Sequence, residues 1–363
     1  MNSTNNKEIE WIFNLQKEVP VFLNELKSEL TPGFYKYSLS GDILSDKKKW
    51  GLGNTVFAVK LLYTLGVLNN YSTTDKKILS NFILNFKDKN GMFYDNNLLR
   101  KSFLRKKLSA IKNRDLANFF NKKTKIAETK QAISTLKLLN VHISSPEKIV
   151  PNNFQEISKY LNNLDWSKPW GAGSHFAHLC FFLNNSDLKN KRQLIDYAIN
   201  WVNNIQKNDG FWYTGKPSTQ QKINGAMKII RGLTFAGYKS FQSPKKIIDG
   251  CLKAKNDSQA CDNFNVIYNI YKANEVVEGN YRQDEIRRFA SDRIKIYKNY
   301  YHQKKGGFSF HLNKSGFYYY GTIITKAKNE PDIHGTFMFL WGLSMIAKIL
   351  KIEKKTNLVF QES

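Results

Sequence analysis

The chain is poor in cysteine and proline. Its 363 residues include three cysteines, Cys180, Cys251 and Cys261, which are widely spaced and odd in number. Such a set predicts no disulfide framework of the kind that small secreted proteins need. The eight prolines mark no linker, and no Gly/Ser-rich stretch interrupts the chain. We therefore expect one domain over residues 1–363, with an amphipathic lead-in at 1–45, a main body at 46–350 and a tail at 351–363.

Long apolar runs are also missing. The longest, Phe337–Ala347, is shorter than the roughly 20 residues that span a bilayer. Residues 1–30 mix Lys and Glu with apolar residues, which predicts an amphipathic helix and not a secretory signal. Together these features predict a cytoplasmic protein.

Acidic residues are scarce, with 30 Asp and Glu against 56 Lys and Arg and a formal net charge of +26. This basic balance suits an anionic substrate or an anionic membrane surface, and no motif points to a specific nucleic acid. The densest basic segment, 98–125, has apolar residues at helical spacing. It is either a solvated helix face or a patch that meets a membrane or a partner.

Six segments of the sequence share one pattern. Each begins with small or polar residues and then becomes apolar on nearly every side. A helix that is hydrophobic all round is a buried helix. More highly charged, amphipathic segments lie between them. The apolar segments are 50–66, 127–140, 170–185, 223–237, 260–274 and 332–350, and the amphipathic ones include 74–86, 152–163, 188–206, 242–255 and 280–301.

This alternation predicts an all-α fold, an (α/α)6 barrel with six inner and about six outer helices, although a helical solenoid would alternate in the same way. Three short motifs support the repeat, because each places turn glycine before aromatic residues. They are "NGMFYD" at 90–95, "DGFWY" at 209–213 and "GGFSF" at 306–310.

Two of these motifs and the last helix resemble a known superfamily. "DGFWY" and "GGFSF" are similar to the Gln-Trp-type repeats of squalene cyclases, and "DIHGTFMFLWGLSMIA" at 332–347 looks like the last inner helix of protein prenyltransferase β subunits. The resemblance to terpenoid cyclases and protein prenyltransferases implies an α/α toroid. It also implies a transferase or cyclase that acts on an isoprenoid or other lipid-linked anionic substrate in a central cavity. The Asp-x-Asp-Asp acid motif of class II terpene cyclases is missing.

The resemblance further implies a zinc site and a helical protein partner, since prenyltransferase β subunits have both. Their last helix places an Asp shortly before a zinc-binding His, and an earlier helix begins with Asp-x-Cys. Here Cys261 and Asp262 are adjacent and in the opposite order, so their side chains point about 100° apart. The candidate ligands are Asp262, Cys261 and His334, and zinc is the candidate cofactor.

Further candidates come from the first turns of the predicted inner helices, which meet at one mouth of such a barrel. Helix N-termini there favour anions, and polar groups without partners would cost roughly 1–3 kcal/mol each. A shared cavity explains them, but satisfied core histidines, surface ion pairs, a packed hairpin or N-caps explain them too. Asp332, directly before the last apolar helix, is expected to be such a cap. The catalytic candidates are Asp262, His334, His175, His178 and Glu128, and the substrate-binding candidates are Asn224, Lys228, Arg231, Asn265, Trp170, Tyr319 and Trp341.

Two other functions fit the same cavity. A carbohydrate-active (α/α)6 enzyme, such as a glycan lyase, hydrolase or epimerase, would use His, Tyr and Asp for acid–base chemistry. A non-catalytic toroid would bind a lipid, glycan or small molecule there.

Overall fold

The computed structural model describes residues 6–44, 50–100, 104, 107–108, 122–146, 149–254, 258–360 and 362. The chain divides into two compact units. Unit 1 combines residues 1–143 with 294–361 and 363, and unit 2 combines residues 144–293 with Glu362. Most of the predicted basic segment at 98–125 lies outside the described residues.

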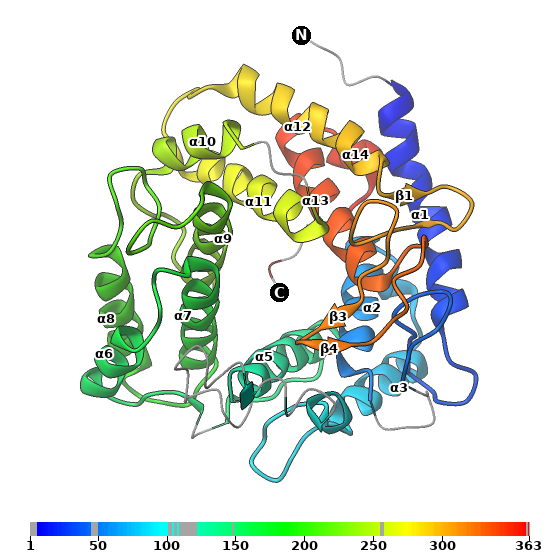
Figure 1. Ribbon diagram of the computed structural model, residues 1–363, viewed down its shortest axis with the longest axis horizontal. Helices are drawn as coiled ribbons and strands as arrows, with labels where there is room; N and C mark the ends of the chain where they lie inside the picture. Colours follow the sequence, from blue (N-terminus) through cyan, green and yellow to red (C-terminus); the bar gives the residue numbers. More distant parts are fainter. Residues whose placement is uncertain are drawn as a thin grey trace. The chain divides into compact units, whose positions relative to one another are not determined.

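Unit 1 is built from helices and two small hairpins (Figure 1). Its elements are α1 (Asn6–Leu26), α2 (Leu52–Thr64), η1 (Leu68–Asn70), α3 (Thr73–Leu84), α5 (Lys122–Leu138), β1 (Tyr301–His302), β2 (Gly307–Phe308), β3 (Tyr318–Tyr319), β4 (Thr322–Ile323), α13 (Ile333–Leu350) and α14 (Glu353–Thr356). The strands pair antiparallel, β1 with β2 and β3 with β4. The hairpins join α12 (Gln283–Lys298), which contains the boundary between the units, to α13.

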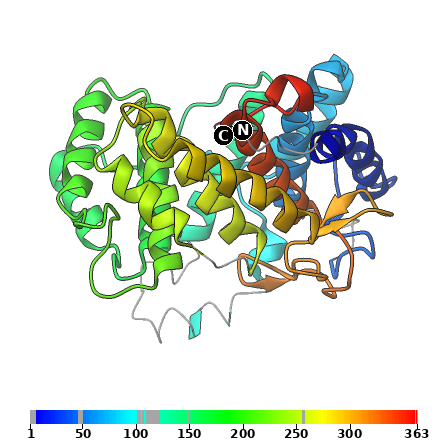
Figure 2. The same ribbon diagram turned by 90° about the horizontal axis from the view of Figure 1, so that it is seen from above.

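The regular structure of unit 2, in its described residues, consists of helices. Its helices are α6 (Phe154–Asn162), α7 (Pro169–Asn184), α8 (Lys191–Asn203), α9 (Thr219–Phe235), α10 (Pro244–Leu252) and α11 (Ala260–Val276). Helices α7 and α9 lie side by side (Figure 1 and Figure 2). A Cβ on Gly173 of α7 would lie only 2.9 Å from the carbonyl oxygen of Gly225 of α9, so glycine permits this close packing.

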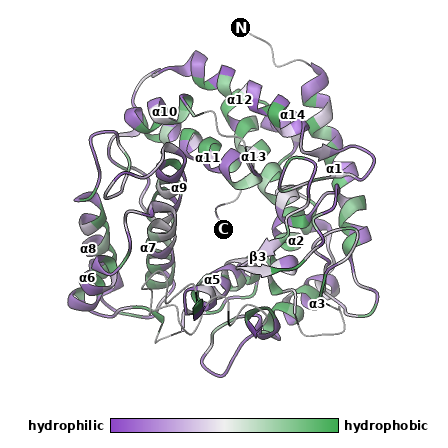
Figure 3. Cartoon of the chain, in the orientation of Figure 1, coloured by the Kyte–Doolittle hydropathy of each residue, from purple (hydrophilic) through white to green (hydrophobic). Residues whose placement is uncertain are grey.

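The predicted alternation of buried and amphipathic helices is confirmed. The six apolar segments form α2, α5, α7, α9, α11 and α13, and the amphipathic segments form α3, α6, α8, α10 and α12. Figure 3 shows hydrophilic and hydrophobic stretches together on α6 and α8, whose buried residues recur at helical spacing. A half-buried helix needs this spacing because only one of its faces meets other helices.

The core of unit 1 forms where α2 packs against α5 and α13. Helix α13, over Ile333–Leu350, is long and apolar enough by composition to cross a membrane, and 83% of it is buried inside the protein. The helix is therefore longer than the apolar run Phe337–Ala347 suggested. Its burial is typical of a core helix.

The three glycine-aromatic motifs form turns of similar design. Gly91, Gly210 and Gly306 have φ values of 80°, 87° and 67°, which favour glycine. In unit 1, two of these turns are tied to the next buried helix in the same way. The backbone N–H of Phe93 donates to Thr129 Oγ1 of α5 at 3.0 Å, and that of Phe308 donates to Thr336 Oγ1 of α13 at 3.0 Å.

Candidate functional site

His334, in the first turn of α13, lies among aromatic rings in unit 1. Its ring stacks on Phe57 of α2, with ring centroids 4.4 Å apart and an interplanar angle of 12°. Phe310 lies 4.8 Å away, centroid to centroid. The Tyr37 hydroxyl oxygen is 3.2 Å from His334 Nδ1, so these two groups share a hydrogen bond. His334 therefore presents a polar ring edge inside an otherwise aromatic site.

Asp332 holds the start of α13 in place. It is fully buried, and its Oδ1 accepts a hydrogen bond from the backbone N–H of Gly335 at 2.8 Å. Its Oδ2 accepts from the N–H groups of Phe310 at 2.7 Å and Gly316 at 2.8 Å. Burial raises the pKa of this carboxyl to about 6, against the opposing effect of these hydrogen bonds. Asp332 is thus the helix cap that the sequence indicated, and it also positions His334.

The β3–β4 hairpin brings Tyr319 to the same site. The ring centroid of Tyr319 lies 5.9 Å from that of Phe57 and 6.5 Å from that of His334. A Cβ on Gly53 of α2 would lie 2.3 Å from the Tyr319 hydroxyl, so this ring position requires glycine there. Burial, followed by the neighbouring groups Tyr320 and Glu128, raises the pKa of Tyr319.

Glu128 of α5 is almost fully buried, and its Oε2 accepts a hydrogen bond from the backbone N–H of Asp95 at 3.0 Å. The structure thus brings together Tyr319 and His334, which the sequence proposed separately, and Glu128 lies in the same unit, where it contributes to the raised pKa of Tyr319. Trp341 belongs to the same face of α13, because its ring stacks on Phe337 with centroids 5.2 Å apart.

Sequence reasoning missed Lys60 of α2. This lysine is 1% exposed, and its Nζ donates to Gln131 Oε1 at 2.6 Å. The ammonium also lies 6.0 Å from the ring centroid of Phe337, so a positive charge borders the aromatic cluster. The sequence does contain a signal for this residue, because Lys60 is the one charged residue in the apolar segment "NTVFAVKLLYTLG".

A second polar group lies in unit 2, where Asn224 of α9 faces α11. Asn224 Nδ2 donates to Asp262 Oδ1 at 3.0 Å, and Asn265 Nδ2 donates to Asn224 Oδ1 at 2.8 Å. The other oxygen of Asp262 accepts from Ser258 Oγ at 2.9 Å. These three predicted residues do come together, and they form a closed, buried network that joins two helices.

The remaining candidates in unit 2 lie on α7, α9 and α11. The half-buried His175 and His178 rings have centroids 5.8 Å apart, edge to face, and Trp170 is half-buried one turn earlier. Arg231 is 6% exposed, and its guanidinium lies 5.2 Å from the Phe235 ring centroid. The proposed roles of these residues stay predictions.

Lys228 is expected to make stability depend on pH. Burial, followed by repulsion from Arg231, lowers the pKa of Lys228 to about 8. The folded state therefore favours the neutral amine, and this contribution to stability is lost as the pH falls from 10.5 through 8. Lys228→Met should gain stability relative to the wild type as the pH falls from 9.5 to 7, measured by urea unfolding.

Lys222→Met is the matched control on the same helix, because Lys222 forms an ion pair with Asp209 at 2.9 Å and its pKa is raised. Its stability difference from the wild type should stay flat between pH 7 and 9.5. Parallel curves for Lys228→Met and the wild type would contradict the expected effect of the buried amine.

The described residues contain no group of three or more His, Cys, Asp or Glu side chains that could hold a metal ion. Both oxygens of Asp262 already accept hydrogen bonds from Asn224 and Ser258. His334 shares its Nδ1 with Tyr37. Zinc binding by Asp262, Cys261 and His334 stays a prediction, because His334 belongs to unit 1 and the other two residues belong to unit 2.

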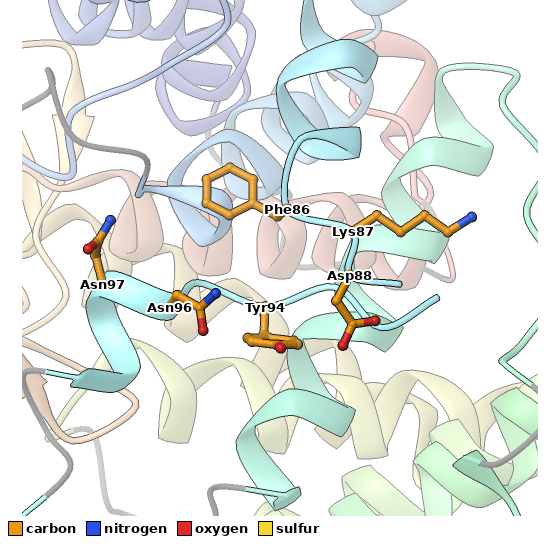
Figure 4. Close-up of a pocket in the computed structure, with 6 residues that line it drawn as sticks. All are labelled: Phe86, Lys87, Asp88, Tyr94, Asn96 and Asn97. Atoms are coloured by element: carbon orange, nitrogen blue, oxygen red, sulfur yellow. The ribbon is translucent and has the colours of Figure 1, made fainter. Parts of the chain in front are cut away.

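A small pocket of about 140 Å³ lies in unit 1 between α3 and the segment that leads to α5. Figure 4 shows Asp88 and Tyr94 projecting to one side of the loop and Phe86 to the other. Asp88 Oδ1 accepts hydrogen bonds from the backbone N–H groups of Asn90 at 2.8 Å and Met92 at 2.9 Å. These contacts shape the first glycine-aromatic turn, so the pocket is explained by the turn itself.

Comparison with known proteins identifies the family. Residues 1–145 and 293–361, more than half of the chain, match the model of the prenyltransferase alpha-alpha toroid domain. The chain belongs to this family. Its fold class is accordingly the all-α toroid that the helix alternation predicted. The matched residues nearly coincide with unit 1, so the His334 site belongs to the part of the toroid domain that the family model covers.

Other comparisons add little. A crystal structure of a protein from Actinoplanes is similar to the toroid at a TM-score of 0.42 with 10% sequence identity, covering 92% of this chain and 98% of that chain. No curated protein matches the sequence significantly.

Proposed function

We propose that this toroid is an enzyme, a transferase or cyclase, that acts on an isoprenoid or another lipid-linked anionic substrate. The aromatic cluster around His334 carries the proposal. Aromatic faces attract cations by about 0.5–2 kcal/mol each, which is what a developing carbocation requires. Membership of the prenyltransferase toroid family supports the same substrate class. The cluster comprises Tyr37, Phe57, Phe310, Tyr319, Phe337 and Trp341.

The reaction assigns roles to Lys60 and His334. The bond between the isoprenoid carbon and the diphosphate oxygen breaks, and its electron pair leaves with the diphosphate. Lys60 supplies positive charge beside Phe337 to oppose the leaving anion. The cation is then consumed, either by losing a proton or by bonding to an acceptor that loses one. His334 accepts that proton through a ring nitrogen.

The direct test is to incubate the purified protein with geranyl, farnesyl and geranylgeranyl diphosphate, with and without thiol acceptors. Released pyrophosphate and organic products are measured together. We expect at least one substrate to release pyrophosphate with a matching product. Absence of release with every substrate and acceptor, from protein with a cooperative unfolding transition, would overturn the proposal.

A second candidate is a carbohydrate-active enzyme, favoured by one specific observation. Glu128, Tyr319 and His334 supply a carboxylate, a phenol and an imidazole within unit 1, where Glu128 is buried and the other two are half-buried. Such a set suits acid–base chemistry on a glycan. Cleavage of an anionic or neutral oligosaccharide panel, without any pyrophosphate release from the prenyl substrates, would favour this alternative.

A further inference from the structure

The β3–β4 hairpin of unit 1 presents two apolar side chains to solvent. Its register pairs Tyr318 with Ile323 and Tyr319 with Thr322. Because successive strand residues point to opposite faces, each pair occupies a face of its own. Tyr319 lies beside His334, with ring centroids 6.5 Å apart, and Thr322 is 4% exposed. Tyr318 and Ile323 are 42% and 46% exposed, so the hairpin has a protein-facing side and an apolar outer face.

Hydrogen bonds hold the hairpin in this orientation. Thr322 Oγ1 donates to the carbonyl oxygen of Leu98 at 3.0 Å, and the backbone N–H of Ile43 donates to the carbonyl oxygen of Ile324 at 2.7 Å. The outer face cannot turn inward without losing these bonds and removing Tyr319 from the aromatic cluster. The solvated face of an antiparallel sheet is normally polar, so an apolar pair held outward indicates a surface that covers it.

The chain around the hairpin is basic. Residues 303–329 contain five lysines and neither Asp nor Glu, and all five lysines are exposed. The Lys314 ammonium lies 5.0 Å from the Phe317 ring centroid, and that centroid lies 4.3 Å from the centroid of Tyr318. Positive charge is therefore placed beside the apolar outer face, and no acidic side chain of this segment opposes it.

We propose that the outer face of the β3–β4 hairpin, Tyr318 with Ile323, docks on an anionic lipid surface together with the lysines of residues 303–329. Tyrosine favours the boundary between lipid and water, and an isoleucine gains by leaving water there. Each lysine near an anionic head-group layer adds attraction. A nucleic acid or an acidic protein would use the lysines but leave the apolar pair in water. The combination of the two signals favours lipid.

The apolar part of this surface is tested with vesicles of phosphatidylcholine and phosphatidylserine at a ratio of about 7:3, sedimented with the full-length protein. Threonine suits a strand, so Ile323→Thr should keep the hairpin. We expect it to weaken vesicle binding about fivefold, and the double variant with Tyr318→Thr to weaken it about thirtyfold. Val21→Thr is the matched control, because Val21 is a 60% exposed aliphatic residue on α1, one turn from Glu18. It should leave binding unchanged.

The charged part is tested by Lys326→Gln combined with Lys328→Gln. This pair should weaken binding to the mixed vesicles about tenfold and leave binding to pure phosphatidylcholine vesicles unchanged. The matched control combines Lys354→Gln with Lys355→Gln, since these exposed lysines follow Glu353 in α14 and the net charge falls by the same amount. It should have less than half of that effect on a logarithmic scale, because its charges lie away from the hairpin in sequence.

Hydrogen exchange on the wild type gives a readout that needs no variant. Mixed vesicles should slow amide exchange in the peptide that covers residues 311–328, because the lipid surface shields the hairpin from water. Exchange in residues 6–26, which form α1, should not change. A melting temperature for each variant shows whether the hairpin substitutions leave the protein folded.

Unchanged exchange in residues 311–328, or equal vesicle binding by the hairpin variants and their controls, would overturn the docking surface. Binding that falls with Lys326→Gln and Lys328→Gln but ignores Tyr318→Thr and Ile323→Thr would also overturn it, and would point to an acidic macromolecule. These readouts involve no turnover, so failure of the docking surface is distinguishable from failure of the reaction proposed at His334.

Discussion

Asp332→Ala is expected to lower the free energy of unfolding by roughly 4 kcal/mol. The carboxylate accepts hydrogen bonds from the backbone N–H groups of Gly335, Phe310 and Gly316, all within 2.8 Å. Alanine would leave three donors without this partner in a fully buried place. Each unsatisfied buried group costs about 1–3 kcal/mol, and relaxation of the loop recovers part of that. Urea unfolding followed by circular dichroism measures the loss.

Two variants control this experiment. Asp332→Asn keeps one acceptor oxygen and should lose about half as much stability. Ser72→Ala removes a solvent-exposed cap of α3, where the serine Oγ accepts from Asp75 N–H at 3.0 Å, and should cost only about 1 kcal/mol. An Asp332→Ala loss no larger than the Ser72→Ala loss would show that the three hydrogen bonds contribute little.

His334→Phe is expected to reduce turnover of the prenyl substrate by about a thousandfold with little loss of stability. Phenylalanine preserves an aromatic ring that can stack on Phe57, whose centroid now lies 4.4 Å from that of His334. It removes the ring nitrogens that accept the proton. The measurement is kcat for pyrophosphate release, with the melting temperature recorded for each variant.

Tyr37→Phe is the matched control for this change. It removes the hydroxyl that lies 3.2 Å from His334 Nδ1 and leaves the imidazole in place. Its loss of turnover should be about tenfold, because the hydroxyl only orients the ring and its proton. Wild-type turnover in His334→Phe would show that the imidazole takes no part in the chemistry. His334 would then be a packing residue of the aromatic cluster.

The sequence was most informative about helices. Buried and amphipathic helices have different apolar spacing, and this spacing is a local property of the chain. The boundaries of α11 and α13 therefore lie within two residues of those predicted, at Ala260–Val276 and Ile333–Leu350. The N-cap at Asp332 could also be predicted from the sequence, because a short polar side chain directly before an apolar helix has few other roles.

The sequence predicted the candidate site only in part. Glu128, Tyr319 and His334 were proposed one by one, and their placement in unit 1 depends on the packing of α2, α5 and α13 with the β3–β4 hairpin. Lys60 was not predicted as a site residue, because a single lysine within an apolar segment forms no recognisable motif. The joint role proposed for Asp262 and His334 remains a prediction, since they belong to separate units.

The sequence by itself determined the all-α class, the order of buried and amphipathic helices, the glycine turns and the cap of α13. Each depends on residues within one or two helical turns, where sequence distance and spatial distance agree. Tertiary structure alone decided that Phe57 stacks on His334, that Asp262 is satisfied by Asn224 and Ser258, and that Glu362 reaches Tyr268. These contacts join distant parts of the chain, and their partners are selected by packing and charge once the helices have come together.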